Sequence, residues 1–439
     1  MLRATFFMLC TLTPVAAQEW FVAGTGDDGN SGTIATFPFR TLQHAAGVAR
    51  AGDTVLIGDG TYTGEPDNHD NEVLLITSSG TADAWITWKA QPGTTPVLRS
   101  TGWSIIRIRG SYHHLDGLTV LGHSEELNLA DALADGLSEK SEARYNTNGI
   151  CIEGRKQQSK PHHITIRNCS VGRCPGGGIV GLEADHLTVE DCRVFDNCWY
   201  MRYAGSGITT LDSWQSDQDP GYHLVFQRNL VWNNRTLVPW GKTGKLSDGN
   251  GILLDVTEGG SGPANPLDET PAQVDGAAKK NGRPEWTARS LVANNVSCDN
   301  GGSGIHCFRT RNVDIVNNTT YHNGSVVGYP ELFANNCTNV RILNNAVIPR
   351  AGAAVTSNNR NTDVLWDHNI YPTAQTVLAG PHDVVADPLF VKPGNDPSTG
   401  DFHLQPGSPA IGSGCTIVPL TTTRNPDLGA YAMPGSTTR

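Results

Sequence analysis

The chain has 439 residues, of which 49 are glycine and 38% are hydrophobic, and its formal net charge is −11. Nucleic acid and anionic membrane surfaces require a basic footprint that such an acidic chain lacks, so we expect neither as a partner. The length would allow two or three compact domains, but many glycines and few hydrophobic residues suit short strands joined by many turns.

Residues 1–17 have the composition of a signal peptide. Arg3 gives a positive start, residues 4–15 form an apolar core of about a dozen residues, and residues 15–17 provide a small-residue cleavage site. This core is too short to span a bilayer, and no other segment approaches the roughly 20 apolar residues of a membrane span. We therefore expect a monomer that is secreted or periplasmic and has no membrane span.

Residues 18–62 are expected to form an N-terminal cap and the first coils of the fold. They contain a strand at 19–23 and a helical pattern at 40–50, with Thr41 in the position of an N-cap. Residues 52–62 then enter the first coils. Because the open end of a solenoid exposes its core, a helix in this place is most simply a cap.

A repeated phrase, a hydrophobic strand that ends in a polar pair, dominates the chain from residue 162 onward. The last residues of the successive pairs are Cys169, Cys192, Asn229, Asn295, Asn318, Asn345 and Asn369. The steps between them are 23, 37, 66, 23, 27 and 24 residues, which gives a base period of about 24 with two coils enlarged by loops. Leucine-rich repeats share this period, but their Leu frame and helical return are absent.

The strands alternate, are rich in Val, Ile and Thr, and are separated by Gly and Asn, which tolerate turns with positive φ. This pattern predicts an all-β fold, a right-handed parallel β-helix with aliphatic residues and stacked Asn inside. We expect one continuous domain over residues 18–439, with a C-terminal cap region at 380–439.

Two insertions interrupt the repeat. Residues 123–148 are acidic and rich in helix formers, which indicates a surface excursion with helical character. Residues 256–288 are rich in Gly, Pro and polar residues and have no period, which is typical of a long loop. Loops of this size on one face of a rigid scaffold often form the wall of a binding cleft.

Nine cysteines remain after Cys10 leaves with the signal peptide. Cys169 and Cys192 occupy the same repeat position, and Cys174 and Cys198 also lie at similar offsets. Export would permit a disulfide, and stacked buried thiols are an equally good interpretation.

Several phrases resemble those of known secreted proteins. They lie at residues 21–32, 38–43, 52–57, 60–62, 304–308, 316–321, 386–390, 407–411 and 427–431. In these phrases the chain resembles the pectate-lyase-like β-helix superfamily over nearly its whole mature length. The resemblance implies the β-helix fold and a carbohydrate-related function, because the superfamily includes lyases, hydrolases, epimerases and non-enzymatic binding proteins. It carries over no catalytic residue, since the catalytic phrases of pectate lyases with a lysine base and of polygalacturonases are absent here.

The stretch 245–255 is the centre of the candidate site. It belongs to a set of aligned Gly-Ile strands that begin at Gly149, Gly178, Gly207, Gly251 and Gly304. If each Ile points inward, the second and fourth residues after each Gly point outward. The predicted outward residues are Glu153, Asp255 and His306, with Asp212 and Arg309 at strand ends. Since stacked coils are ~4.8 Å apart, Asp212, Asp255 and His306 or Arg309 should form a surface ladder within ~10 Å.

This ladder suits β-elimination of a polysaccharide that contains uronic acid. Asp212, Asp248 and Asp255 would hold Ca²⁺, which prefers oxygen ligands and would neutralise the substrate carboxylate. Lys245, His306 or Arg309 would act as the base, with Asp255 in the catalytic group as well. The residues expected to bind substrate are Tyr203, Trp214, Trp240 and the more remote Glu153.

Two other functions suit the same residues. A glycoside hydrolase would use two of these aspartates as general acid and as base or nucleophile. Five of the ten tryptophans, Trp199, Trp214, Trp232, Trp240 and Trp286, lie in this region of the sequence. A non-catalytic protein would bind glycans through a face rich in these tryptophans and would not need the aspartates. Each residue also has a purely structural interpretation: Asp248 as a turn residue, Arg309 as a partner of a nearby carboxylate, and Lys245 and Glu153 as ordinary surface residues.

Overall fold

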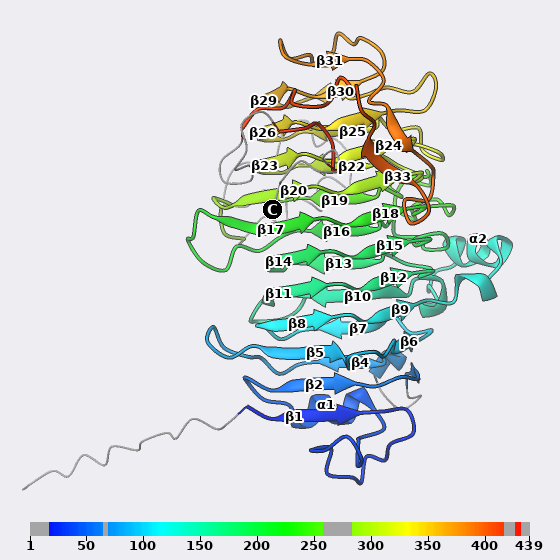
Figure 1. The fold of residues 1–439 in the computed structure, drawn as a ribbon. Coiled ribbons are helices and arrows are strands. Elements are labelled where there is room, and N and C mark those ends of the chain that lie inside the picture. The colour runs from blue at the N-terminus through cyan, green and yellow to red at the C-terminus, as the bar shows by residue number, and fades with distance from the viewer. Residues whose placement is uncertain (1–16, 65–68, 258–282, 417–425, 432–439) are drawn as a thin grey trace, which may run out of the picture.

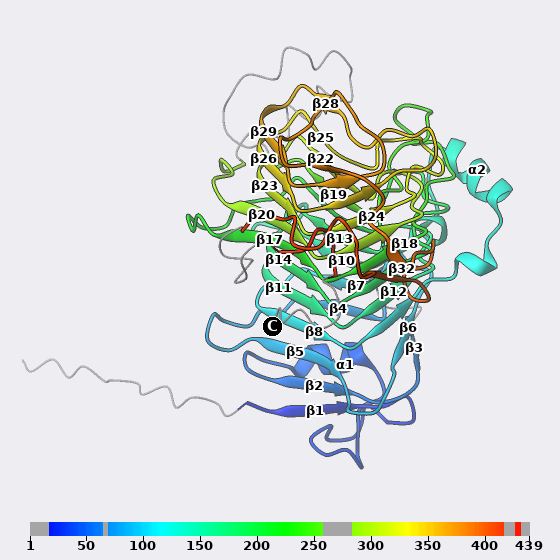
Figure 2. The same ribbon diagram turned by 45° about the horizontal axis from the view of Figure 1, so that its top comes forward.

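The structure is a computed structural model that describes residues 17–64, 69–257, 283–416 and 426–431. Within these residues the chain winds in coils that stack along one axis, and most coils contribute one short strand to each of three parallel sheets (Figures 1 and 2). The predicted parallel β-helix is therefore confirmed. Nearly all of the predicted signal peptide (1–17) and most of the predicted loop at 256–288 lie outside the described residues.

The three sheets, here named A, B and C, contain most of the strands. Sheet A consists of β1 (Glu19–Val22), β2 (Thr54–Ile57), β5 (Ile86–Ala90), β8 (His113–Asp116), β11 (His162–Arg167), β14 (Asp185–Glu190), β17 (Tyr222–Gln227), β20 (Arg289–Ala293), β23 (Arg311–Val316), β26 (Thr338–Leu343) and β29 (Thr362–Asp367). Sheet B consists of β3 (Thr61–Thr63), β6 (Val97–Arg99), β9 (Thr119–Leu121), β12 (Ser170–Gly172), β15 (Arg193–Phe195), β18 (Leu230–Trp232), β21 (Val296–Cys298), β24 (Thr319–Tyr321), β27 (Ala346–Ile348), β30 (Ile370–Tyr371) and β31 (Val384–Val385). Sheet C consists of β4 (Leu74–Ile76), β7 (Ser104–Ile108), β10 (Asn148–Glu153), β13 (Ile179–Leu182), β16 (Ile208–Leu211), β19 (Ile252–Asp255), β22 (Ile305–Phe308), β25 (Leu332–Asn335) and β28 (Asn358–Asn359).

The interior is built from identical positions of successive coils. In sheet C the register aligns a column of aliphatic residues, each fully buried: Ile106, Ile150, Ile179, Ile208, Ile252, Ile305 and Leu332. This column confirms the predicted alignment of the Gly-Ile strands. Because neighbouring coils bury these side chains against each other, the core is continuous along the axis.

Asparagine ladders occupy the turns. Between sheets A and B, the side-chain amide of each ladder residue donates to the Oδ1 of the next at 2.9–3.0 Å, through Asn229, Asn295, Asn318, Asn345 and Asn369. Cys192 precedes this ladder, and its backbone N–H donates to Asn229. The predicted internal Asn stack is thus confirmed. The nine cysteines of the described residues are free thiols, which matches stacked buried thiols rather than a disulfide. A second ladder between sheets B and C runs through Asn197, Asn234, Asn300 and Asn323 and ends on Glu331.

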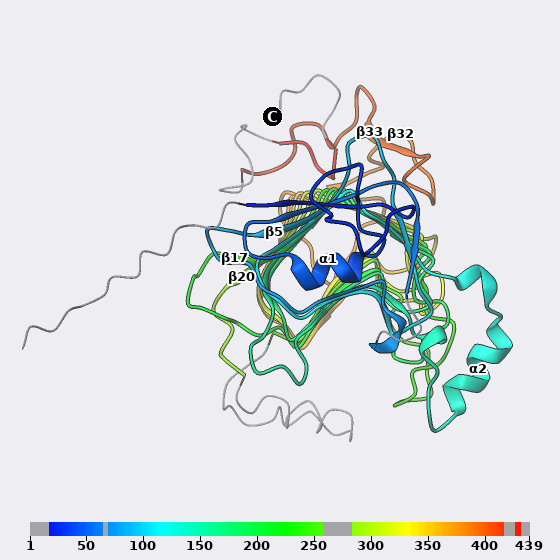
Figure 3. The ribbon, with the colours of Figure 1, turned by 90° about the horizontal axis from the view of Figure 1, so that it is seen from below.

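Helices lie at one end and on one side of the solenoid. The helix α1 (Leu42–Val48) begins after Thr41, whose Oγ1 accepts from the backbone N–H of His44 at 3.1 Å, as predicted for the cap. Figure 3, a view along the axis, shows α1 across the N-terminal end of the solenoid and α2 (Leu129–Leu137) projecting from its side. The helix α2 lies in the predicted excursion at 123–148.

Smaller elements complete the described chain. They are three 3₁₀ turns, His69–Asn71, Ser124–Glu126 and Ala143–Tyr145, and an antiparallel pair near the C-terminus formed by β32 (Phe390–Lys392) and β33 (Asp401–Leu404). None of the helices in the described part of the chain has the length and apolar character needed to traverse a lipid bilayer.

Candidate active site

The turn that leads into β19 is fixed by Asn250, which is fully buried. Its Oδ1 accepts from the backbone N–H and the hydroxyl of Ser303 at 2.9 and 2.8 Å, and its amide donates to Ser206 at 3.2 Å and to Asp248 at 3.3 Å. Asn250 therefore ties together three coils. Asp248 has φ +62°, a left-handed conformation that aspartate tolerates better than most residues, so it does act as a turn residue.

Asp255 ends β19 and pairs with Leu211 in one neighbouring strand and with Phe308 in the other. Asp212 and Arg309, which the sequence placed at strand ends, follow one residue after the positions that pair with Asp255. Both have positive φ, +57° and +51°, so they occupy the turn that ends their strands. The members of the predicted ladder therefore lie on neighbouring coils, with Asp212 and Arg309 one residue past the level of Asp255.

Asp255 interacts electrostatically with the other two predicted aspartates, Asp212 and Asp248. Burial raises the pKa of Asp255 well above its ordinary value, and the nearby charges of Asp248 and Asp212 raise it further. Arg309 and Arg283 oppose this rise. We call Asp212, Asp248, Asp255, Arg283 and Arg309 the acidic cluster.

Two of the carboxylates in this cluster are costly to ionise. Oδ1 of Asp255 is shielded from solvent and has no hydrogen-bond partner within the described chain. Burial raises the pKa of Asp248 to about 7, although the amide of Asn250 opposes the rise. A buried carboxylate that lacks a partner is unstable as an anion, and a bound cation is one means of stabilising it.

Arg283 is the member of the cluster that the sequence did not predict. Its Nη2 lies 2.7 Å from Oδ1 of Asp212, and both side chains are buried, with 2% and 11% of their surface exposed. Arg283 comes from the aperiodic insertion at 256–288, where no repeat relates it to a strand. Its pairing with Asp212 could be found only from the three-dimensional structure.

His306 differs from its predicted place on the surface. It points outward from β22, as the alternation requires, but only 7% of it is exposed, because the rings of Phe333 and Tyr329 lie against it. Its ring stacks on Phe333 at a centroid distance of 4.1 Å. Neither ring nitrogen has a hydrogen-bond partner within the described residues, and burial lowers the pKa of His306 to about 3. The imidazole is therefore neutral at physiological pH.

Lys245 lies in an exposed turn before β19. Its backbone carbonyl accepts from the N–H of Trp240 at 2.9 Å, and the neighbouring Lys242 places its ammonium 5.7 Å from the centre of the Trp240 ring. We find no ion pair or hydrogen bond of the Lys245 ammonium in the described part of the structure. The structure thus groups Lys245 with Trp240 and does not bring it into contact with the acidic cluster.

The predicted substrate-binding residues lie at opposite ends of the sheet C strands. Glu153 and Trp214 lie where strands end, and Tyr203 and Trp240 lie in loops before strands begin. Glu153 ends β10 and forms a two-bond ion pair with Arg155, at 2.9 and 2.7 Å, three coils before Asp255. Trp214 follows Asp212, and the ammonium of Lys160 lies 4.8 Å from the centre of its ring. Tyr203 lies in the loop before β16, at the opposite ends of the sheet C strands, where its hydroxyl bonds Ser141 at 2.7 Å.

The aspartates of the cluster are not preassembled around a metal ion. Three groups within the described residues bring imidazole or carboxylate ligand atoms within 4.8 Å of one another, and none of these groups contains Asp212, Asp248 or Asp255. The donor chemistry does fit Ca²⁺, because all three side chains offer oxygen and that of Asp255 is unsatisfied. To bind one ion together, the three side chains would have to move closer, and Arg283 would have to release Asp212.

Comparisons with known proteins place the fold in a family. No curated protein matches the chain. Among solved structures, the pectate lyase Pel9A matches 96% of this chain and 98% of its own with 16% identity and a TM-score of 0.52. A PL6-family alginate lyase, AlyGC, matches 75% of this chain and 37% of its own, with 15% identity and a TM-score of 0.44. A rhamnogalacturonan lyase matches 86% of this chain and 91% of its own chain, with 13% identity and a TM-score of 0.39.

At these identities the structural likeness shows the fold alone. A family model described as the Pel9A-like, right-handed β-helix region matches residues 20–339. The handedness predicted for the β-helix is thereby confirmed, as is the resemblance to pectate-lyase-like proteins. The chain belongs to the family of proteins with a Pel9A-like right-handed β-helix.

Proposed function

We propose that the protein is an exported polysaccharide lyase that cleaves a uronic-acid-containing chain by β-elimination at the acidic cluster. The observation that carries the proposal is the desolvated, unpartnered carboxylate of Asp255 beside two further aspartates and two arginines. Membership of the Pel9A-like β-helix family supports the same class of reaction.

Asp212, Asp248 and Asp255 would hold a divalent cation, and Ca²⁺ is the cation whose ligand preference they match. When bound, such an ion neutralises the C6 carboxylate of the substrate and so acidifies the C5 proton. In its absence Arg283 neutralises Asp212 through their 2.7 Å ion pair. Movement of Arg283 away from Asp212 would free a carboxylate oxygen for the ion and a guanidinium for the acidic substrate.

Three residues remain candidates for the base that removes the proton. Arg309 belongs to the cluster but carries a charge that must be lost before it can accept a proton. His306 is already neutral, since its pKa is about 3, but it is buried and would need the site to open. Lys245 is exposed and would need its turn to move toward Asp255. Separate Arg309→Gln, His306→Asn and Lys245→Gln variants distinguish them, because only loss of the base should abolish turnover while cation binding is retained.

A second candidate function is glycoside hydrolysis, and one specific observation favours it. The pKa of Asp255 is raised by burial and by neighbouring carboxylates, as it is in the general acids of glycosidases. Asp212, paired with Arg283 at 2.7 Å, would then act as the base or nucleophile.

The test is an activity screen on polygalacturonate, alginate and glycosaminoglycans, with added Ca²⁺ and with a chelator. A lyase releases unsaturated sugars that absorb in the ultraviolet, and this signal should disappear in Asp255→Asn. Reducing ends without that absorbance would establish the hydrolase. Glycan binding that survives Asp255→Asn, without any product, would establish a binding protein that uses Trp214 and Trp240.

A further inference from the structure

A ladder of stacked rings lies at the start of the sheet A strands and shares no residue with the acidic cluster. The register aligns one ring residue from each of four successive coils: Tyr112, His163, His186 and His223. Their ring centroids are separated by 4.7, 4.1 and 3.7 Å, and each pair is stacked. The stack brings three imidazoles to one edge of the solenoid, and a repeating core does not require this.

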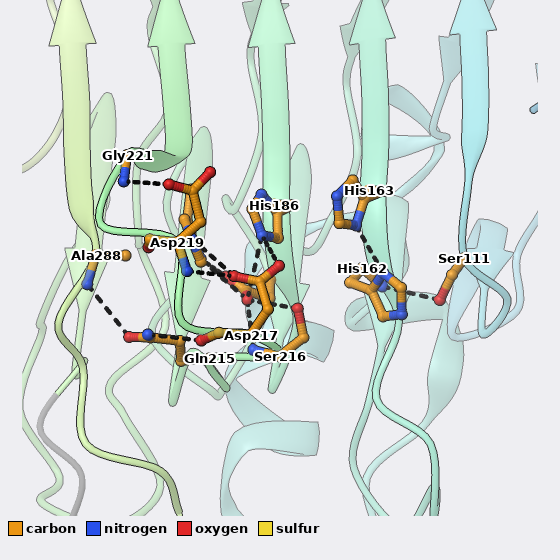
Figure 4. A network of polar contacts seen from close by, with 12 residues as sticks. Ser111, His162, His163, His186, Gln215, Ser216, Asp217, Asp219, Gly221 and Ala288 are labelled. Carbon is orange, nitrogen blue, oxygen red and sulfur yellow. Dashed lines mark hydrogen bonds and ion pairs between the residues drawn. The ribbon is translucent and has the colours of Figure 1, made fainter. Parts of the chain in front are cut away.

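A loop places a carboxylate on this ladder. Asp217 lies between β16 and β17, and its Oδ2 is 2.8 Å from Nε2 of His186. Its Oδ1 accepts from the backbone N–H of Asp219 at 2.9 Å, which fixes the turn that carries it. One ring nitrogen of His163, one of His186 and one oxygen of Asp217 lie within 4.8 Å of one another. Figure 4 shows the two histidines on neighbouring strands with Asp217 reaching His186 from the loop.

The remaining polar groups support these three side chains from outside. Both ring nitrogens of His223 face acceptors, Oδ1 of Asp185 at 2.9 Å and the carbonyl of Asp219 at 3.0 Å, so this ring donates twice and has no lone pair to offer. Asp185 is fully buried and also accepts from the N–H and hydroxyl of Ser216 at 2.6 and 2.8 Å. These hydrogen bonds fix the ring of His223. Because the ring of His186 stacks on it at 3.7 Å, His223 in turn positions His186.

His162 plays a similar part for His163. A hydrogen bond of 2.7 Å joins the Nδ1 atoms of the two rings, which leaves Nε2 of His163 available as a ligand atom. A metal-binding imidazole commonly has its other nitrogen held by a hydrogen bond of this kind. The site is also open to solvent, because His163 and His186 are partly exposed and the side chain of Asp217 is 44% exposed.

We propose that His163, His186 and Asp217 bind one divalent transition-metal ion, for which Zn²⁺ is the probe. Two imidazole nitrogens and one carboxylate oxygen form a ligand set that Zn²⁺ accepts, and the exposed side leaves a position for water. Ca²⁺ is excluded, because it takes oxygen ligands. The ion would join two coils to the loop that follows Asp212. It would thus hold in place the segment that connects the acidic cluster to sheet A.

The test measures Zn²⁺ binding to the full-length protein by titration calorimetry at neutral pH after treatment with a chelator. A second group, Asp367, His368 and His382, also has its ligand atoms within 4.8 Å, so every protein in the test carries His382→Asn. In this background we expect one equivalent of Zn²⁺ to bind and Ca²⁺ not to compete. Bound Co²⁺ should show the strong visible absorption of a tetrahedral site.

Two variants probe the ligands with little disturbance of the fold. Asp217→Asn keeps an oxygen that can accept from Asp219, and His163→Phe keeps a ring in the stack between Tyr112 and His186. Each should weaken Zn²⁺ binding by at least about tenfold. The control is His403→Phe, because His403 also stacks on a ring, that of Tyr431 at 4.7 Å, and bonds a single carboxylate, Asp401 at 2.7 Å.

The control should bind Zn²⁺ as the background protein does, and circular dichroism should show that all variants are folded. The proposal is overturned if the background protein binds no Zn²⁺, or if folded Asp217→Asn and His163→Phe both bind it with unchanged affinity. The second result would mean that Zn²⁺ binds adventitiously elsewhere.

Discussion

Replacing Asp248 by Asn should change how the stability of the protein depends on pH. Burial raises the pKa of Asp248 from 3.8 to about 7 in the folded protein. The folded state therefore binds a proton more tightly than the unfolded chain does between about pH 4 and pH 7. Asp248 contributes stability that is fully present below its unfolded pKa and is lost as the pH rises through its folded pKa.

The size of this loss follows from the shift. A rise of about three pH units, at about 1.4 kcal/mol per unit, gives a ceiling of about 4 kcal/mol in the free energy of unfolding. Asp248→Asn removes the titrating group but retains a residue that tolerates the left-handed backbone of this turn. In the absence of divalent cations, the variant should match the wild type near pH 4 and exceed its stability near pH 8.

Urea denaturation between pH 4 and pH 8 with a chelator present measures this difference. Asp363→Asn is the matched control, because Asp363 has a similar φ of +55° but is exposed, and it should leave the pH dependence unchanged. If the free energy of unfolding depends on pH in the same way for wild type and Asp248→Asn, the burial of this carboxyl is refuted. Under the proposed function, Ca²⁺ should stabilise the wild type at pH 8 and stabilise Asp248→Asn much less.

Three further predictions concern the scaffold and the cluster. Leu254→Ala should lower the free energy of unfolding by about 2–5 kcal/mol in urea denaturation, because Leu254 is fully buried and the variant leaves a cavity. Asn318→Ala should cost about 2–5 kcal/mol in the same assay, since it leaves the backbone and side-chain N–H groups of Asn295 without their acceptor. Arg283→Gln should tighten Ca²⁺ binding in calorimetry by up to about tenfold, because the arginine no longer competes for Asp212; unchanged or weaker binding would contradict this role.

The fold could be predicted from the sequence because stacked coils place equivalent residues in equivalent surroundings. The column that contains Ile150 and Ile305 and the ladder that contains Asn229 and Asn369 both recur in the sequence at the repeat spacing. A solenoid repeats its local contacts, so a periodic sequence is enough to define both the strands and the direction of their side chains. The outward direction of Asp255 followed from the same alternation.

The burial of the site could not be predicted in this way. Alternation says that His306 points out of the solenoid, but it does not say that the rings of Phe333 and Tyr329 lie against it and bury it. Arg283 comes from a segment without period, so no repeat in the sequence indicates its position beside Asp212.

The imidazole ladder did leave a signal in the sequence. His163, His186 and His223 each directly precede the first inward aliphatic residue of a sheet A strand, and aligning those strands would have revealed the column. Asp217 could not have been added to it, because its loop has no counterpart in the neighbouring coils.

The most direct test of the proposed function compares wild type and Asp255→Asn on polygalacturonate and alginate, with Ca²⁺ and with a chelator. We predict unsaturated products from one of these polymers with wild type and Ca²⁺, at least about a hundredfold less product with Asp255→Asn, and a melting temperature that is not lowered. A lyase centred on Asp255 would be contradicted if Asp255→Asn kept the activity of the wild type, or if the products of the wild type were not unsaturated.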